Sequence, residues 1–268
     1  MKFVRGGLQM TTIRDCIAPD RNPKVPSIKL PEGSIDTHVH IFESQYPLFE
    51  GRGYNPPDST LDDLKHLHSQ LGVSRVVYTQ PSPYGVDNSA ILKGMKVMND
   101  ETPGRARGVC AIKMDVSDDF LEDLDKQGIK GVRLNMDNIG GMPIGLDEIP
   151  TLEARIKDLG WHVEYLFPGK DIVELAPIFK KSSVPISIAH FAYQPATNGI
   201  NSDGFKTLLD LVRDGNTWIK ISGANRVSET DLPPYDDVMP MARALIEANP
   251  ENIMWGTDWP HPNKYKVN

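Results

Sequence analysis

The sequence predicts an α/β fold in which eight parallel strands close into a (β/α)8 barrel, the TIM-barrel architecture. From residue 34 onward, short β-branched or aromatic runs alternate with longer amphipathic runs, and the units recur about every 30 residues. The chain has 268 residues and 39% hydrophobic content, which suffices for one large domain of this kind. Repeated strand–helix crossovers of one handedness favour a parallel sheet that closes on itself.

Eight segments have the length, the β-branched or aromatic content and the flanking turn residues that are typical of strands. In chain order these segments are SIDTHVHI (34 to 41), SRVVYTQ (74 to 80), ARGVCAI (106 to 112), IKGVRLN (129 to 135), WHVEYLF (161 to 167), PISIAHF (185 to 191), TWIKISG (217 to 223) and NIMWGTD (252 to 258). We expect all eight to lie in one parallel sheet.

Amphipathic segments follow the first seven candidate strands, and their apolar residues recur with helical spacing. The expected helices cover residues 61 to 71, 87 to 100, 121 to 128, 146 to 160, 170 to 182, 205 to 215 and 237 to 250. The sequence printed after the eighth strand ends in HPNKYKVN, which is too short for a further helix. The prediction is therefore a barrel that lacks its final helix.

Residues 1 to 33 precede the repeating pattern and differ from it. The stretch APDRNPKVPSIKLPEG is rich in proline and charge and has no apolar periodicity. We expect an irregular N-terminal arm over residues 1 to 33, lying on the surface or partly disordered, and the barrel over residues 34 to 268.

The composition limits the kinds of partner. The formal net charge is −7 and no dense block of Lys and Arg occurs, which argues against binding nucleic acid or anionic lipid. Cys16 and Cys110 supply neither a disulfide framework nor a zinc-ribbon spacing. No signal-peptide core or membrane-length apolar run is present. We expect a cytoplasmic protein that acts on small molecules, and the sequence leaves homo-oligomer formation open.

Polar residues gather at the carboxyl ends of the candidate strands, where TIM barrels carry their reactive groups. Asp36, His38 and His40 share one face of an extended chain, so we expect three polar groups to converge at the first strand. The candidates from the other strands are Gln80, Arg133, Asn135, Tyr165 or its neighbour Leu166, His190, Arg226 and Asp258. Their joint placement, more than any one residue, predicts a functional site.

Single histidines have ordinary structural explanations. A lone strand histidine such as His162 is usually a satisfied core or surface residue. His66 and His68 lie on an expected helix among charged residues, where we expect both to be solvated. His261 follows the last strand closely and fits either a site residue or a loop residue.

Five motifs carry a resemblance to a known family: DTHVHIF, GVRLN, GWHVEYLF, KISGANRVS and WGTDWPHPN. They resemble the amidohydrolase superfamily, in its branch of 2-pyrone-4,6-dicarboxylate hydrolases, sugar lactonases and lactone isomerases. The similarity runs from Gly33 to Asn263, and the combination of an HxH strand with GTDWPHP is specific. The resemblance implies an elliptical (β/α)8 barrel and the hydrolysis or isomerisation of a lactone.

The resemblance allows the histidines to be metal ligands or hydrogen-bond donors. Metal-dependent members add a carboxylated lysine or an acid on strand four, or further histidines on strands five and six. Strand four here presents Arg133, which stays protonated, cannot ligate a metal and disfavours a divalent cation. We therefore expect no cofactor. The alternative is one zinc ion held by His38, His40, His190 and Asp258.

The metal-free interpretation assigns roles to four residues. His38, His40 and His190 donate hydrogen bonds to the lactone carbonyl and stabilise its oxyanion. Asp258 is the general base, which takes a proton from the attacking water and returns it to the ring oxygen.

Substrate binding is expected from a second group of residues. The planar guanidinium groups of Arg133 and Arg226 suit a carboxylate. The alternative for Arg133 is a structural pair with an internal acid such as Asp36. Tyr54 resembles a loop tyrosine that contacts substrate in the family. The remaining candidates are Asn135, Tyr165, Tyr193, Gln80 and His261.

Two departures from the pyrone hydrolases bear on the substrate. Those enzymes follow the sixth-strand histidine with MGR, whereas HFAYQP here places Tyr193 where the arginine would be. The second basic residue expected after GVR is also missing around Ile139. Because losing a bidentate ion pair in a desolvated site costs about 2 to 5 kcal/mol, a lactone with one acid group or a sugar-acid lactone fits best.

Two other kinds of function stay open. One is a lactone isomerase or a zinc-dependent decarboxylase on the same barrel, which product analysis and metal content would distinguish. The other is a non-catalytic barrel relic, because a missing eighth helix would leave apolar surface uncovered. The complete set of candidate catalytic residues argues against the relic.

Overall fold

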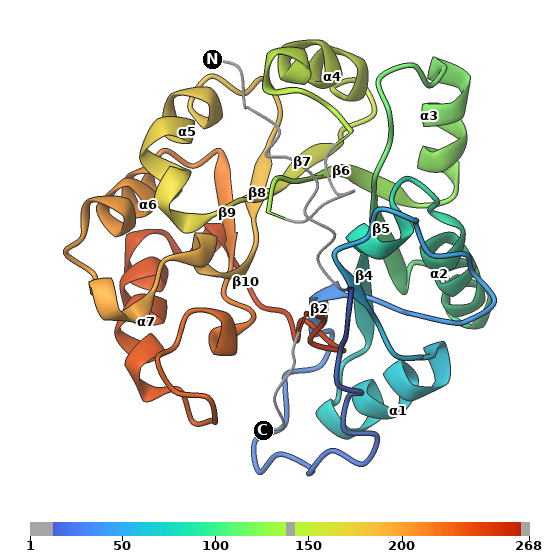
Figure 1. Ribbon diagram of the computed structural model, residues 1–268, viewed down its shortest axis with the longest axis horizontal. Helices are drawn as coiled ribbons and strands as arrows, with labels where there is room; N and C mark the ends of the chain where they lie inside the picture. The colour runs from blue at the N-terminus through green and yellow to red at the C-terminus, as the bar shows by residue number, and fades with distance from the viewer. Residues whose placement is uncertain (1–12, 138–142, 264–268) are drawn as a thin grey trace.

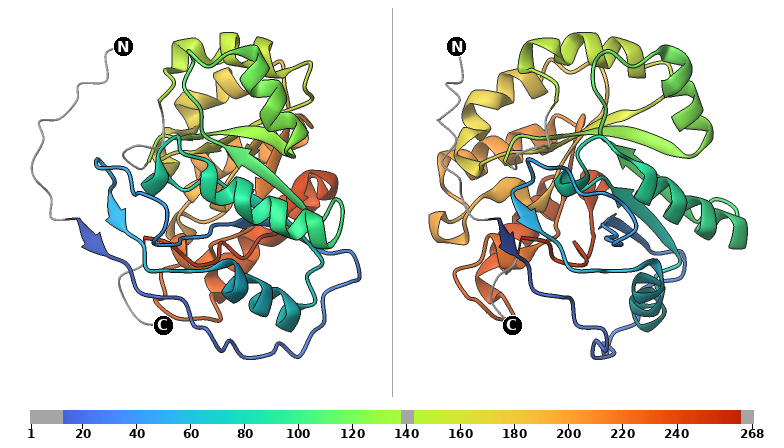
Figure 2. Two further views of the ribbon diagram at one scale, coloured as in Figure 1. Left: turned by 90° about the vertical axis from the view of Figure 1, so that its right-hand side faces the viewer. Right: turned by 45° about the vertical axis from the view of Figure 1, so that its right-hand side comes forward.

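The computed structural model describes residues 13 to 137 and 143 to 263. Eight parallel strands form one sheet in the order β10-β9-β8-β7-β6-β5-β4-β2, so each strand neighbours the next one along the chain. The seven α-helices found in the described residues surround this sheet (Figures 1 and 2). The predicted (β/α)8 architecture is therefore confirmed.

All eight predicted strands are present, and β6 keeps its predicted length. The strands of the barrel are β2 (Ile35–Val39), β4 (Arg75–Thr79), β5 (Ala106–Cys110), β6 (Ile129–Asn135), β7 (His162–Leu166), β8 (Ile186–Ile188), β9 (Thr217–Lys220) and β10 (Ile253–Met254).

All seven predicted helices are also present, with ends that differ by a few residues from the expected ones. They are α1 (Leu61–Leu71), α2 (Ser89–Glu101), α3 (Asp118–Lys126), α4 (Ile149–Ile156), α5 (Ile172–Phe179), α6 (Asp203–Arg213) and α7 (Met239–Ala248). Helix α1 matches its predicted range because its ends are marked by strong local signals. Thr60 and Asp63 form a capping box, and Gly72 ends the helix with φ of 77°.

The barrel closes between its first and last strands. Val39 forms an isolated parallel bridge with Trp259. The amide of His40 donates to the carbonyl of Trp259 at 2.8 Å, and the amide of Asp258 donates to the carbonyl of His38 at 2.9 Å. These bonds hold the segment that carries Asp258 directly against the strand that carries both histidines.

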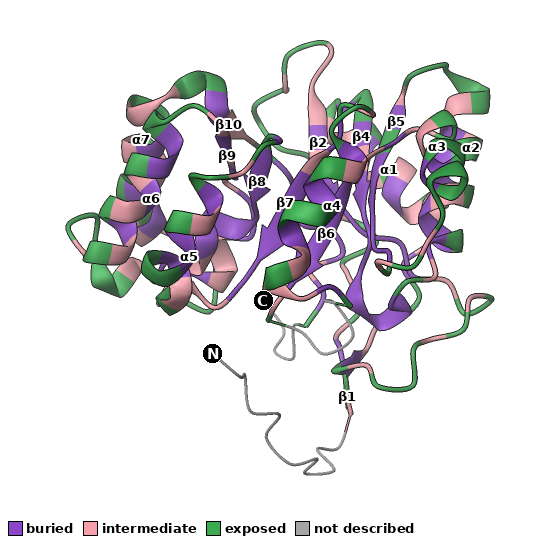
Figure 3. Cartoon of the chain, turned by 90° about the horizontal axis from the view of Figure 1, so that it is seen from above, coloured by how far each residue is buried: buried purple, intermediate pink, exposed green. Residues whose placement is uncertain are grey.

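Burial follows the layers of the barrel. The barrel strands are mostly buried, and the helices bury the side that faces them and expose the other (Figure 3). Because side chains alternate along a strand, β6 turns Arg133 and Asn135 toward the barrel interior and Leu134 toward the surrounding helices. The interior near the strand ends is consequently polar.

The described part of the arm is tied to the barrel by a small sheet. Strand β1 (Arg14–Asp15) pairs in parallel with β3 (Tyr54–Asn55), and the amide of Cys16 donates to the carbonyl of Asn55 at 2.8 Å. The first 12 residues of the predicted arm lie outside the described residues.

No helix follows β10 among the described residues, which end at residue 263. A groove of about 790 Å³ lies beside the closing strands, with Leu67 and Leu71 of α1 and Trp255 in its lining. The arm contributes Ile17 and Pro19 to the same lining, so it covers part of this surface. Within the described ranges, no helix is both long enough and apolar enough to cross a membrane.

Candidate active site

Four buried side chains meet at the carboxyl ends of β2 and β8 and just beyond β10. The Nε2 atoms of His38, His40 and His190 lie 3.8, 3.8 and 3.5 Å from Oδ1 of Asp258. Among the described residues, neither Oδ1 of Asp258 nor Nε2 of His38 has a hydrogen-bond partner. Three nitrogens and one carboxylate oxygen therefore face a common centre, and the predicted cluster does form.

The backbone directs two of these side chains into the centre. His190 begins a run of four residues, ending at Tyr193, whose φ angles lie between 50° and 54°. Asp258 has φ of 59°. Left-handed backbone costs non-glycine residues roughly 1 to 2 kcal/mol each, and such strain is concentrated at functional sites. The left-handed turn after β8 also places the Tyr193 ring, stacked on His190, at a centroid distance of 5.8 Å.

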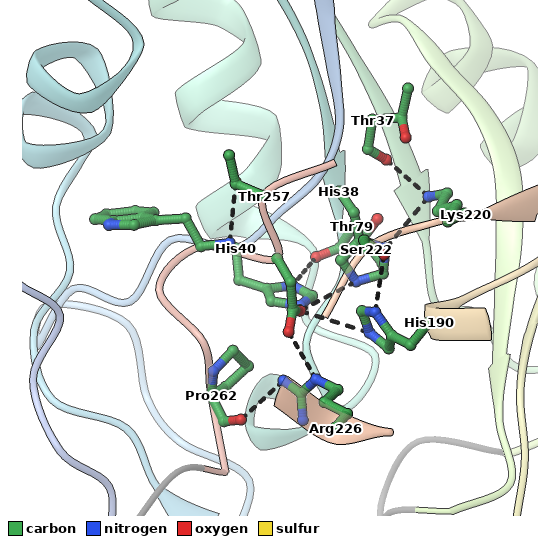
Figure 4. A network of polar contacts seen from close by, with 12 residues as sticks. Thr37, His38, His40, Thr79, His190, Lys220, Ser222, Arg226, Thr257 and Pro262 are labelled. Atoms are coloured by element: carbon green, nitrogen blue, oxygen red, sulfur yellow. Dashed lines mark hydrogen bonds and ion pairs between the residues drawn. The ribbon is translucent and has the colours of Figure 1, made fainter. Parts of the chain in front are cut away.

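His40 presents an unprotonated nitrogen to the centre. Its Nδ1 lies 2.7 Å from the carbonyl oxygen of Thr79, and because a carbonyl only accepts, Nδ1 must carry the proton (Figure 4). Burial, with Arg133 nearby, holds the pKa of His40 well below its ordinary value. Neutral His40 therefore offers a lone pair at Nε2, which corrects the expectation that all three histidines donate hydrogen bonds.

His190 is positioned by the next strand. Its Nδ1 lies 2.9 Å from the hydroxyl of Ser222, which follows β9. Burial lowers the pKa of His190 to about 3, although the charge of Asp258 acts in the opposite direction. When the Ser222 hydroxyl donates to Nδ1, a neutral His190 carries its proton on Nε2, toward Asp258.

Asp258 is held by Arg226. Nε of Arg226 donates to Oδ2 at 2.6 Å, and a second guanidinium nitrogen donates to the carbonyl of Pro262 at 2.9 Å. Burial raises the pKa of Asp258, but Arg226 and His190 outweigh burial and leave that pKa below its usual range. The carboxylate is therefore ionised at neutral pH, with Oδ1 open.

Arg133 reaches from β6 to the end of β4 on one side and to β7 on the other. It donates to the backbone carbonyl of Gln80 at 2.8 Å, and its Nε lies 3.6 Å from Oε1 of Glu164. Arg133 therefore does have an internal acidic partner, as the alternative expected, but that partner is Glu164, directly opposite on β7, and not Asp36.

Asp36 does not join the cluster, which corrects the expected convergence of three groups on β2. Its carboxylate accepts from the amide and the hydroxyl of Thr257 at 2.9 and 2.6 Å. It also lies 3.2 Å from Nε2 of His68. His68 is 2% exposed and not solvated as predicted, because its helix turns it toward this buried acid, whereas His66 is exposed.

The centre opens into a small pocket of about 20 Å³, room for one or two water molecules. Its lining includes the predicted residues Tyr54, Arg133, Asn135, Tyr193, Arg226, His40, His190 and Asp258. This volume is smaller than a lactone ring.

Three predicted binding residues lie elsewhere. Tyr165 points away from the interior and packs on Phe179, at a centroid distance of 4.7 Å, while its neighbour Leu166 lines the pocket. The amide of Gln80 donates to backbone carbonyls of the following loop, so it holds that loop. His261 lines the groove beside the closing strands, yet it stays close to the site, because its amide donates to the carbonyl of Asp258 at 2.6 Å and its ring helps to lower the pKa of that carboxyl. The position of Ile139 is outside the described residues.

Sequence reasoning missed three polar residues around the cluster: Glu164, Lys220 and Ser222. Lys220 is buried and contacts Glu164, the carbonyl of Thr37 and the ring of His38. Burial lowers the pKa of Lys220 from its ordinary value, while Glu164 acts in the opposite direction. The alternation of side chains along a strand could have indicated them. Glu164 lies on the same strand face as Leu166, and Lys220 lies on the same face as Ser222, so both point toward the barrel interior.

The cluster can be compared with a metal site. One ligand atom each from His38, His40 and Asp258 lies within 4.8 Å of the others, a spacing that suits a small cation. The charges do not suit it, because Arg133 and Arg226 both act on the ring of His40 from close by. The donor atoms and their spacing are thus compatible with a metal, while the two guanidinium charges disfavour a divalent ion at this centre.

Comparison with known proteins agrees with the geometry. A model of the amidohydrolase family matches residues 35 to 265. The chain is 35% identical over 252 residues to a 2-pyrone-4,6-dicarboxylate hydrolase of Comamonas testosteroni, covering 90% of this chain and 81% of that protein. It is 33% identical over 255 residues to a 4-sulfomuconolactone hydrolase of Hydrogenophaga intermedia, covering 94% and 82%.

A solved structure shares the fold over most of both chains. It is a probable 2-pyrone-4,6-dicarboxylic acid hydrolase from Acinetobacter baumannii with citric acid bound. The TM-score is 0.73 and the sequence identity 28%, and the match covers 86% of this chain and 85% of that one.

Proposed function

Because the chain belongs to the amidohydrolase family, we propose that it hydrolyses the ring ester of a small, acid-bearing lactone without a metal. Two relatives support a lactone as the substrate class, because one is named a hydrolase of a pyrone dicarboxylate and the other a hydrolase of a sulfomuconolactone.

One observation carries the proposal: Oδ1 of Asp258 is buried, ionised and unpartnered among the described residues, and three imidazole nitrogens surround it. A buried carboxylate oxygen is costly unless something binds it. A water molecule or a substrate oxygen at this centre would satisfy it. This arrangement is suited to a general base beside hydrogen-bond donors.

The proposed reaction needs only groups of this chain. Asp258 takes a proton from water as the water oxygen attacks the lactone carbonyl. Nε2–H groups of His38 and His190 donate to the carbonyl oxygen as it becomes an oxyanion. The ring C–O bond then breaks, and Asp258 returns the proton to the departing ring oxygen. The product is a hydroxy acid, or an enol acid that tautomerises to a keto acid where the ring is a pyrone.

The charges of the pocket favour a substrate with a single acid group. Arg133 and Arg226 line the pocket, but each already donates to protein oxygens and has only its remaining N–H groups for a ligand. Tyr193 lines the pocket at the position where pyrone dicarboxylate hydrolases carry an arginine, so it brings a neutral hydroxyl in place of a positive charge. One carboxylate or sulfonate fits this supply of donors better than two.

A turnover screen tests the proposal. The full chain is incubated with lactones that carry no, one or two acid groups, with product identification and metal analysis on the same sample. We expect ring opening of a lactone with one acid group, and activity lost in Asp258→Asn. Isomerised or decarboxylated products, or no turnover on any lactone, would overturn the proposal.

A further inference from the structure

Lys220 lies behind His38, on the side of the ring that faces away from the reaction centre. Its Nζ is 2.7 Å from the carbonyl oxygen of Thr37 and 3.3 Å from Nδ1 of His38 (Figure 4). It also contacts Oε2 of Glu164. Lys220 is 2% exposed and Glu164 is fully buried. A buried lysine at this position has no part in the reaction proposed above.

We propose that Lys220 is a positioning residue that fixes the tautomer of His38, so that Nε2 of His38 carries the proton that faces the reaction centre. An ammonium group has three N–H donors and no acceptor. Three acceptors surround it here: a carbonyl, a carboxylate and Nδ1 of His38. When Nδ1 accepts, the single proton of a neutral imidazole must be on Nε2.

The same logic gives His40 the opposite polarity. Nδ1 of His40 donates to the carbonyl of Thr79, so Nε2 of His40 is an acceptor. The two histidines of the HxH motif therefore offer the centre one donor and one acceptor. For the proposed hydrolysis, on which this part of the inference rests, His38 would bind the carbonyl oxygen and His40 would accept from the attacking water.

Lys220 also bears on the zinc alternative. A metal ligand must offer a lone pair, and His38 has none at Nε2 while Lys220 donates to Nδ1. Removing the lysine frees Nδ1 to take the proton and leaves a lone pair at Nε2. The lysine is therefore expected to suppress metal binding at a cluster whose spacing would otherwise permit it.

A neutral Lys220 would reverse the assignment. A neutral amine has two N–H donors for the three acceptors, so it would take a hydrogen bond from Nδ1–H of His38. Nε2 of His38 would then carry the lone pair. The location of one proton on one ring thus decides the proposal.

Nuclear magnetic resonance of the full chain with 15N-labelled histidine locates that proton. Two-bond nitrogen–hydrogen correlations distinguish the Nε2–H tautomer from the Nδ1–H tautomer, and His38→Gln and His40→Gln serve only to assign the signals. We expect Nε2–H for His38 and Nδ1–H for His40. An Nδ1–H tautomer at His38 in the unmodified protein would overturn the proposal, even if every variant failed to fold.

Variants test whether Lys220 is the cause. Lys220→Met removes the donor, and Lys220→Met with Glu164→Gln removes both charges, so no unpaired buried carboxylate remains. We expect His38 to lose its pure Nε2–H tautomer in either folded variant, with His40 unchanged. The matched control is Lys130→Met, which breaks a lysine–aspartate pair away from the site. An unchanged His38 tautomer in both folded variants would refute the role of Lys220.

Zinc titration by calorimetry, with the metal alone as ligand, gives a second readout. We expect the Lys220 variants to bind zinc at least tenfold more tightly than the unmodified protein and than Lys130→Met. Equal affinity would contradict the suppression of metal binding. Neither measurement uses a lactone, so a failure of the proposed hydrolysis and a failure of this inference are separately visible.

Discussion

Arg226 and Asp258 form an ion pair that leaves one carboxylate oxygen free for chemistry. Nε of Arg226 donates to Oδ2 at 2.6 Å, while Oδ1 faces the three histidines. The arginine therefore sets the charge of the base as well as the shape of the pocket. A substrate carboxylate that draws Arg226 toward itself would weaken this pair and make Asp258 a stronger base.

Arg226→Met should raise the pKa of Asp258, because burial then acts without the opposing guanidinium charge. Asp258 is inactive as a base when protonated, so the acidic limb of the kcat/KM profile should move to higher pH. The pH dependence of turnover measures this shift. Arg226→Lys keeps a positive charge and should shift the limb less, and an acidic limb that stays in place in Arg226→Met would contradict the assigned coupling.

Asp258→Asn keeps the shape of the side chain but removes its ability to accept a proton. We expect hydrolysis to fall by roughly 10²-fold or more, the range typical of general-base catalysis. Steady-state turnover of whichever lactone the screen identifies gives the ratio. Asp210→Asn, an exposed aspartate, is the control, and near-normal turnover by Asp258→Asn would exclude its role as base.

Metal removal should leave the enzyme active. If Asp258 and the histidines act directly on substrate, prolonged chelation should not change kcat, and elemental analysis should find well under one equivalent of zinc. Mock dialysis without chelator is the control. Activity that is lost on chelation and returns with zinc would favour the zinc alternative.

Thr257 links the buried acid of β2 to the segment that carries the base. Its hydroxyl donates to Asp36 at 2.6 Å and accepts from the amide of Trp259 at 3.1 Å. Thr257→Val should lower the free energy of unfolding by about 1.5 to 3 kcal/mol, the usual contribution of a hydrogen bond to a charged group. Denaturant unfolding measures it. Thr257→Ser keeps the hydroxyl, so equal stability of the two variants would refute the effect.

The barrel could be predicted from the sequence because its signals are local and repeat. Strand composition, helical periodicity and capping recur in each unit, and α1, with a capping residue at one end and a glycine at the other, has its predicted bounds. The arm gave no such signal. Its two-residue strand β1 (Arg14–Asp15) depends on a partner 40 residues away, which no local pattern announces.

The site was predictable where residue type and strand end coincide. His38, His40, His190 and Asp258 combine reactive groups with positions at the carboxyl ends of strands, and they do meet. The burial of His68 depends instead on a long-range contact with Asp36, so its charged helical neighbours gave the wrong expectation.

The sequence could not predict which ring nitrogens of His38 and His40 donate and which accept, because this too depends on long-range contacts. Whether a histidine donates or accepts depends on the atom behind its ring. For His40 that atom is the carbonyl oxygen of Thr79, 39 residues along the chain. For His38 it is the Lys220 ammonium, 182 residues along the chain.

Arg133 has two possible roles, binding of a substrate carboxylate and support of the barrel, and one variant distinguishes them. Arg133 lines the pocket, while its Nε lies 3.6 Å from Oε1 of Glu164. If Arg133 binds a substrate carboxylate, Arg133→Met should lower kcat/KM for an acid-bearing lactone by about 2 to 5 kcal/mol of transition-state binding. A neutral lactone of similar size should lose much less, because it makes no contact with the guanidinium charge.

If Arg133 only supports the barrel, the variants should show a different pattern of stability and activity. Removing it leaves Glu164 with Lys220 as its remaining cationic contact, so Arg133→Met would lower thermal stability and impair both substrates equally. Arg133→Lys is the matched control, since it restores the charge near Glu164 but not the planar fork that holds a carboxylate. Selective loss on the acid-bearing lactone, persisting in Arg133→Lys at near-normal stability, identifies substrate binding. Equal losses for both lactones, recovered in Arg133→Lys, would assign Arg133 to the support of the barrel instead.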